Sequence, residues 1–284
     1  MSLPRVSAWM ALATITGKPM PIQLQPRIAE LEQWSKLARW ENAVFEVIDP
    51  FLGPDIGTLG KQLCIAEQYR KTGLTASVHG AFIDVNPASG DPDIRELSRR
   101  RCRESCEIAM ALGAGNLVFH SSAFPFLRGA YLENWAACCA DFYEELAADY
   151  PVRICLENAQ DLDPTPLRKL MERVRSDRIS VCLDIGHANY SRTPVGQWFD
   201  QLGEWIQYMH LSDNLGEFDD HLPLGQGCVD WELVNRHWKA LGKDIPVTLE
   251  TGTLEATGQS VAFLRNHRYF GLEGNGHEQF GTDS

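Results

Sequence analysis

Histidines and acidic residues follow several short apolar runs of this chain, at the point where each run ends. Five of the eight histidines are placed in this way, although histidine is rare in the sequence. Carboxylates gathered without Lys or Arg repel one another unless a cation lies between them, and carboxylate oxygens together with imidazole suit a divalent metal. The residue types therefore predict a metal site, provided that the fold brings together Glu46, His79, His120, Glu157, Asp184, His187, His210, Asp219, His221 and Glu250.

The elements that would position these residues alternate along the chain. Short runs rich in β-branched residues are typical of strands, and the longer amphipathic runs between them are typical of helices. The predicted strands are 6–11, 43–49, 75–82, 116–122, 152–159, 179–187, 206–213 and 246–252. Helices are predicted at 28–40, 59–73, 94–113, 133–150, 165–175 and 231–242. Gly73, Gly113 and Gly242 end three of these helices, as a helix C-terminus favours.

Eight strand units with helices between them, in a chain of 284 residues, predict an α/β fold, a single (β/α)8 TIM barrel. An open doubly wound sheet is the rival fold, but no G-x-G-x-x-G motif follows the first run. We expect the barrel at residues 1–268 and a C-terminal tail at 269–284, where Gly, Glu and Asn predominate. The active site of such barrels lies at the C-terminal ends of the strands, which is where the histidines and acids fall.

The composition limits the partners of the protein. A net charge of −12 provides no electrostatic footprint for a phosphate backbone, so nucleic acid is not expected as a partner. The basic residues at 99–103 lie within a helical pattern and predict a solvated helix face. No apolar run reaches the about 18 residues of a membrane span, no signal peptide is visible, and the cysteines form no C-x-x-C pair. We therefore expect a cytoplasmic protein with a small-molecule substrate and a composition compatible with a homo-oligomer.

Several motifs together resemble the xylose isomerase-like TIM barrel superfamily, which includes sugar and sugar-phosphate isomerases and epimerases, dehydratases and endonuclease IV. These motifs are LEN at 156–158, CLDIGHAN at 182–189, HLSDN at 210–214, DDHLPLGQG at 219–227 and TLETG at 248–252, with ALGAGNLVFH at 111–120 upstream. The resemblance covers about His79 to Gly252, and it is specific for the superfamily but not for the substrate. It implies that Mn²⁺, Mg²⁺, Co²⁺ or Zn²⁺ is bound by Glu157, Asp184, His210 and Glu250.

The resemblance further implies an isomerase or epimerase of a small sugar or a related polyhydroxy carbonyl compound. A metal bridging the carbonyl and the neighbouring hydroxyl would stabilise the enediolate that forms when a carbon proton leaves. Glu157 and Glu250 are the expected acid and base, because they come from different strands and approach the substrate from different sides. A dehydratase would use the same proton abstraction. His187 is expected to contact the substrate, with Trp9 and Glu46 as further candidates for substrate binding.

Endonuclease IV, a phosphoesterase with three zinc ions, is the alternative within the superfamily. By resemblance, two further zinc ions beside the four-residue set would be held by His79, His120 and Glu157 and by His187, Asp219 and His221. Three departures count against this branch: LENAQD lacks its glycine-containing continuation, CLDIGHAN lacks its Thr-Cys before the histidine, and the net charge does not suit a DNA-binding surface. A barrel that binds without catalysis is a third possibility, and it is disfavoured because every metal position holds a competent ligand.

Overall fold

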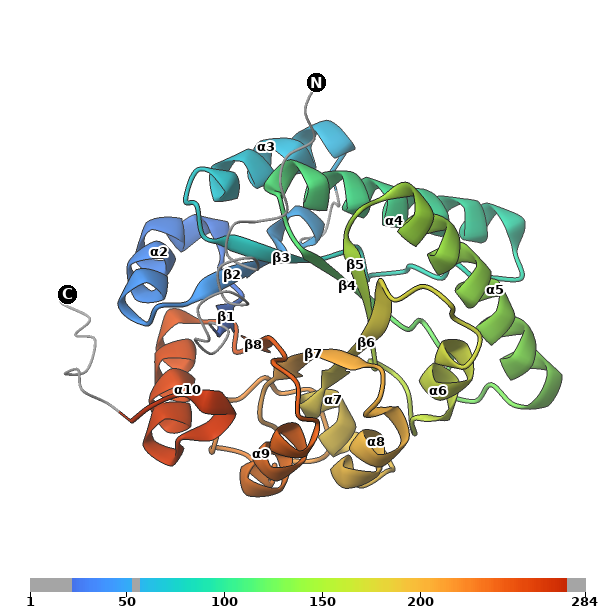
Figure 1. Cartoon of the computed structure of the whole chain (residues 1–284). Helices are drawn as coiled ribbons and strands as arrows, with labels where there is room; N and C mark the ends of the chain where they lie inside the picture. The colour runs from blue at the N-terminus through green and yellow to red at the C-terminus, as the bar shows by residue number, and fades with distance from the viewer. Residues whose placement is uncertain (1–21, 53–56, 275–284) are drawn as a thin grey trace.

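The computed structural model describes residues 22–52 and 57–274 of the chain. In this part of the chain the strands form a closed parallel barrel in sequence order, with the helices around it (Figure 1). The fold is a single (β/α)8 TIM barrel, which confirms the predicted fold class. The strands are β1 (Gln23–Leu24), β2 (Val44–Val47), β3 (Thr75–His79), β4 (Asn116–His120), β5 (Arg153–Glu157), β6 (Ile179–Asp184), β7 (Ile206–Leu211) and β8 (Val247–Leu249).

The helices cover the outside of the barrel, and the six predicted helices are all present. No described helix has both the length and the apolar character that crossing a membrane requires. The helices are α2 (Leu31–Trp40), α3 (Leu59–Arg70), α4 (Pro92–Leu112), α5 (Gly129–Asp149), α6 (Thr165–Met171), α7 (Ile185–Tyr190), α8 (Val195–Leu202), α9 (Trp231–Ala240) and α10 (Leu254–His267). Short 3-10 turns are η1 (Ile28–Glu30), η2 (Asp49–Phe51) and η3 (Tyr269–Gly271).

The first barrel strand is not the one that the sequence pattern favours. β1 has only two residues, and it closes the ring by pairing in parallel with β2 and β8, with Gln23 opposite Val44 and Thr248. Pairing with two neighbours outweighs the weak strand propensity of the polar sequence QLQ. The predicted strand at 6–11 lies outside the described residues, and so does Trp9, whose role stays a prediction.

Apolar packing between the strands and the helices holds the strand ends in place. Trp34 of α2, Trp198 of α8 and Leu24 of β1 are all 0% exposed. Burying one large apolar side chain contributes about 1.5–3 kcal/mol, so this layer is the main source of stability. Burial on both faces fixes the register of these parallel strands. The polar residues at their C-terminal ends are therefore held at fixed positions relative to one another.

Local sequence signals set the boundaries of the helices. The carboxylate of Asp91 accepts hydrogen bonds from two backbone N–H groups in the first turn of α4, and Gly113 ends that helix with φ at +70°. The carboxylate of Asp230 accepts a hydrogen bond from the backbone N–H of Leu233 at 2.9 Å and so caps α9. These contacts are the usual N-cap and glycine C-cap of a helix, and the N-caps fix where the rim loops before α4 and α9 end.

Candidate metal centre

Three acids and one imidazole from four strands meet at the C-terminal end of the barrel. We call them the four-residue group: Glu157, Asp184, His210 and Glu250. Nδ1 of His210 lies 3.3 Å from Oε1 of Glu157, 3.2 Å from Oε1 of Glu250 and 3.9 Å from Oδ2 of Asp184. One ligand atom of each residue lies within 4.8 Å of the others, and all four residues are buried. Oxygen donors with one imidazole, gathered at this spacing, could hold a divalent metal.

The buried polar atoms of the four-residue group that lack a hydrogen-bond partner test whether these residues suit a bound metal. Both carboxylate oxygens of Glu157, Oδ2 of Asp184 and Nδ1 of His210 are buried and have no hydrogen-bond partner in the described structure. Buried polar atoms are nearly always paired, because leaving one unpaired costs about 1–3 kcal/mol. A cation among these atoms would satisfy all of them at once. The residues present therefore fit a bound divalent metal.

Hydrogen bonds behind the group orient its ligands. Asn158 follows Glu157 and joins β5 to β6, since its Nδ2 donates to the carbonyl oxygen of Asp184 at 2.9 Å and its Oδ1 accepts from the backbone N–H of Asp184 at 2.8 Å. The backbone N–H of His187 donates to Oδ1 of Asp184 at 2.6 Å. Oδ2 of Asp184 is thereby left to face the centre of the group.

A second group shares Glu157. Nε2 of His79 lies 3.3 Å from Oε2 of Glu157, and Nε2 of His120 lies 3.7 Å from the same oxygen. Ligand atoms of the three residues again lie within 4.8 Å of one another. Nδ1 of His79 faces the carbonyl oxygen of Gly80 at 3.0 Å, which leaves Nε2 toward Glu157. The ring of Phe82 packs against both imidazoles, at centroid distances of 5.0 and 5.1 Å.

A third cluster connects α7 with the loop after β7. Nε2 of His187 and Nε2 of His221 lie 3.2 and 3.0 Å from the same oxygen, Oδ2 of Asp219. Nδ1 of each imidazole faces a backbone carbonyl at 2.7 Å, that of Asn158 for His187 and that of Glu250 for His221. The structure thus brings the predicted histidines and acids of the rim into one continuous set of contacts.

Burial and mutual contacts shift the pKa values of these residues. Burial lowers the pKa of His120 to about 3, so its imidazole is neutral and able to act as a ligand. Burial raises the pKa of Asp184 to about 7. Burial also acts to raise the pKa of Glu157, but His210, His120 and His187 together outweigh it and hold that pKa well below its ordinary value. Glu157 is therefore ionised at neutral pH, whereas Asp184 is close to its titration point.

Metal affinity is expected to rise with pH because of Asp184. Its carboxyl, with a pKa raised to about 7, is protonated at lower pH and must lose that proton before it can bind a metal. We expect the affinity for Zn²⁺ or Mn²⁺ to increase by about tenfold for each pH unit below 7 through Asp184. It should keep rising above pH 7, because His210 must also lose a proton: burial acts to lower its pKa, but Cys182 and the surrounding carboxylates raise that pKa well above its ordinary value. Competition with a chromophoric chelator, corrected for the protonation of the chelator, measures this dependence. Equal affinity at pH 6 and pH 8 would contradict it.

Glu46, a predicted substrate contact, is paired with other side chains inside the barrel. It lies within β2 at 0% exposure, where its Oε2 accepts a hydrogen bond from the hydroxyl of Tyr208 at 2.7 Å and lies 3.1 Å from Nε2 of His210. Because this oxygen already contacts Tyr208 and His210, Glu46 is engaged with a residue of the four-residue group, and its contact with a substrate stays a prediction. Beside it lies Gln25, which the sequence analysis did not single out, and whose Nε2 donates to Oε1 of Glu250 at 2.5 Å.

The loop after β7 is anchored by Asp213, whose role the motif HLSDN does not reveal. Its carboxylate accepts hydrogen bonds from the backbone N–H groups of Gly225 at 2.8 Å and Val229 at 3.2 Å, and from the indole N–H of Trp231 at 2.8 Å. Backbone hydrogen bonds between Asp213 and Leu222 form an isolated antiparallel bridge. One buried carboxylate thereby holds the loop that carries part of the third cluster.

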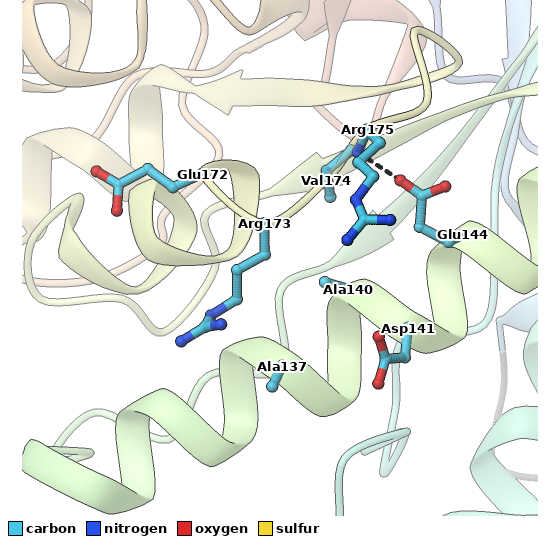
Figure 2. A pocket seen from close by; sticks show the side chains of 8 residues that line it. All are labelled: Ala137, Ala140, Asp141, Glu144, Glu172, Arg173, Val174 and Arg175. Atoms are coloured by element: carbon cyan, nitrogen blue, oxygen red, sulfur yellow. Dashed lines mark hydrogen bonds between the residues drawn. The ribbon is translucent and has the colours of Figure 1, made fainter.

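A cleft of about 590 Å³ lies between α5 and the end of α6, and it is distinct from this centre. Figure 2 shows Ala137 and Ala140 on α5 among the charged side chains that line the cleft, with the backbone of Arg175 hydrogen-bonded to Glu144. None of the rim histidines and acids lines it. The cleft therefore has no part in the chemistry of the four-residue group.

Proteins related to this chain in sequence do not share one described function. The uncharacterised protein MJ1311 of Methanocaldococcus jannaschii is 28% identical over 202 residues, which cover 67% of this chain and 69% of that protein. A probable endonuclease 4 of Mycobacterium leprae is 28% identical over 219 residues, which cover 70% of this chain and 81% of that protein. The sequence relatives alone therefore do not name a reaction.

Solved structures share the fold over most of its length. A D-tagatose 3-epimerase-like protein superposes with a TM-score of 0.74 at 24% identity, covering 88% of this chain and 97% of that protein. The TTHB071 protein from Thermus thermophilus, soaked with ZnCl2, superposes with a TM-score of 0.72 at 26% identity, covering 87% and 97%. The sequence model of the xylose isomerase-like TIM barrel family, a family of enzymes, matches residues 45–267. The chain therefore belongs to the xylose isomerase-like TIM barrel family.

Proposed function

We propose that the chain is a divalent-metal-dependent isomerase or epimerase of a small sugar or a related polyhydroxy carbonyl compound. The pair Glu157 and Glu250 carries the proposal, because their carboxylates lie 3.3 and 3.2 Å from the same ring nitrogen of His210. They come from β5 and β8, which have two strands between them in the ring. Two carboxylates placed in this way can reach one bound substrate from two directions.

The four-residue group is the proposed ligand set. Its three carboxylates and one imidazole suit Mn²⁺, Mg²⁺, Co²⁺ or Zn²⁺. When bound, such a metal supplies a Lewis acid for the carbonyl and hydroxyl oxygens of the substrate. We assign His187 to a substrate hydroxyl, since it lies between Glu157 and Asp219 and is 8% exposed at the rim.

Proton transfer is assigned to Glu157 and Glu250. One takes the proton from the carbon next to the carbonyl, and the other returns a proton to the opposite face for epimerisation or to the neighbouring carbon for isomerisation. Their exposures of 0% and 6% keep bulk water away from the proton in transit. Loss of a hydroxyl from the next carbon, after the same abstraction, would make the enzyme a dehydratase.

The charges around the site favour an uncharged substrate. In the described part of the chain, the ion pairs of the site carboxylates are all with histidines. The ion pairs of Lys and Arg lie among the outer elements, as between Arg103 of α4 and Glu145 of α5. A phosphate group usually meets Arg, Lys or a helix N-terminus in its binding site. A neutral sugar therefore suits this site better than a phosphate ester.

A zinc phosphoesterase of the endonuclease IV type is the second candidate. The second group and the third cluster favour it, because they provide two further sets of imidazole and carboxylate donors beside the four-residue group. The net charge of −12 opposes binding to DNA. The basic run of α4 is also engaged elsewhere, since Arg101 and Arg103 pair with Glu104 and Glu145.

Metal analysis together with two assays separates the candidates. Protein purified without chelator is expected to hold about one divalent metal per chain and to exchange solvent deuterium into the carbon beside the carbonyl of a ketose, tested over a panel of ketoses. About three zinc ions per chain, with cleavage of abasic-site DNA, would instead support the phosphoesterase. Absence of bound metal, with no activation by Mn²⁺, Co²⁺ or Zn²⁺, would contradict both. Bound metal without turnover would indicate a barrel that only binds.

A further inference from the structure

We propose that Gln25 is a positioning residue that orients two of the metal ligands, acting together with Glu46. The proposal rests on the proposed function, because Glu250 and His210 are ligands only if a metal binds. Gln25 directly follows β1 and is 4% exposed. Its Nε2 donates to Oε1 of Glu250 at 2.5 Å and to Oε1 of Glu46 at 3.2 Å. One amide group therefore lies between two carboxylates.

The two carboxylates determine which end of the Gln25 amide faces them. An amide nitrogen has two N–H donors, one for each carboxylate, whereas the amide oxygen is only an acceptor. With the amide reversed, three oxygens would face one another without a proton between them. Hydrogen bonds to ionised acceptors are shorter and stronger than neutral ones, so this contact restrains the Glu250 side chain in one orientation.

Glu46 extends the restraint to His210. Its Oε2 lies 3.1 Å from Nε2 of His210 and accepts hydrogen bonds from the hydroxyls of Tyr208 at 2.7 Å and Thr248 at 3.3 Å. An imidazole that donates its Nε2 proton to a carboxylate keeps Nδ1 free as a ligand atom. Nδ1 is the nitrogen of His210 that faces the three acids of the four-residue group.

Two residues of the four-residue group, Glu250 and His210, thus rely on the side chain of Gln25 for their orientation. Gln25 contacts Glu250 directly and reaches His210 through Glu46, whereas the backbone of Asp184 is held by Asn158. Groups that orient metal ligands typically change metal affinity by about 10–100-fold when they are removed. Removing the amide group of Gln25 is expected to weaken metal binding by the same factor.

The variants Gln25→Met and Gln23→Met test this assignment. Methionine keeps the length of glutamine but cannot donate a hydrogen bond. Gln23 lies two residues earlier, is 3% exposed, and has a buried Oε1 without a partner, so the same change there controls for an apolar side chain in the barrel. Gln25→Met is expected to bind Co²⁺ about 10–100-fold more weakly and to change its visible absorption spectrum, which reports coordination geometry. Gln23→Met is expected to keep both the affinity and the spectrum.

Glu46→Gln provides a second variant that preserves side-chain shape. It is expected to weaken Co²⁺ binding as well, and the double variant with Gln25→Met is expected to lose less than the sum of the two losses, because both residues act on the same ligands. Unchanged Co²⁺ affinity and spectrum in folded Gln25→Met, or in Glu46→Gln, would overturn the proposal, as would an equal loss in Gln23→Met. Wild-type protein that binds none of Co²⁺, Mn²⁺, Mg²⁺ and Zn²⁺ would instead overturn the proposed function, so the two failures are distinguishable.

Discussion

The Glu157→Gln variant is expected to lose both metal binding and proton exchange while its barrel stays folded. The two oxygens of Glu157 lack a hydrogen-bond partner and lie near four imidazoles, those of His79, His120, His187 and His210. A glutamine at this position has no charge to balance a metal, and it turns an amide NH2 toward ring nitrogens. A positioned base contributes about 10²–10⁴-fold, so solvent exchange into the substrate should fall by about a thousandfold.

Glu133→Gln is the matched control for this change. Glu133 lies on α5 at the outer surface, where it pairs with Lys169 and Arg173. The same loss of charge there should leave metal content and exchange intact, with little effect on stability because the ion pairs are exposed. Elemental analysis and deuterium incorporation followed by NMR provide the two readouts. If the variant keeps its metal but loses exchange, Glu157 acts as a base and not as a metal ligand. If it keeps both, Glu157 is neither a ligand nor the base.

Gly227→Ala is expected to destabilise the protein by about 3 kcal/mol, from overpacking and the weakening of charge-assisted hydrogen bonds. A Cβ at Gly227 would lie 2.2 Å from Oδ1 of Asp213 and 2.3 Å from the carbonyl oxygen of Asn214. The chain cannot move away without disturbing the hydrogen bonds that Asp213 accepts from Val229 and Trp231. In a chain of this size the melting temperature should fall by about 6 °C or more.

Gly258→Ala makes the same substitution where space is available. Gly258 lies in α10, and a Cβ there meets no atom within 4 Å. Alanine in a helix interior is more favourable than glycine by about 0.5–1 kcal/mol, so this control should be neutral or slightly stabilising. Calorimetry of both variants without added metal gives the comparison. A Gly227→Ala protein that melts with the wild type would show that Asp213 does not depend on this close approach.

The strands that carry the ligands could be predicted because each ends an apolar run with a polar residue. ICLE and VCLD place Glu157 and Asp184 at the last positions of β5 and β6, where parallel pairing brings them to one edge. β1 could not be predicted in this way. QLQ contains one apolar residue, and its strand depends on pairing with β2, the next strand, and with β8, at the far end of the chain.

The sequence also could not predict which acids face the site and which lie behind its ligands. Glu46 is a strand acid like Glu157, but its Oε2 lies 3.1 Å from Nε2 of His210, the ring nitrogen that does not face the other ligands. Asp213 resembles any other loop acid in the sequence, although its partners extend to Trp231. Side-chain periodicity gives the face of an element, whereas height along the barrel axis follows from strand stagger, which pairing alone determines.

The two-residue strand β1 links the order of folding to the integrity of the site. The hydrogen bond between Gln25 and Glu250 spans 225 positions of the chain. Contacts of such long sequence separation carry the largest loop-closure entropy and are expected to form late. A barrel whose ring is still open lacks the restraint on Glu250, so one of its four ligands is not held in orientation. The site is therefore expected to reach its full metal affinity only after the ring has closed.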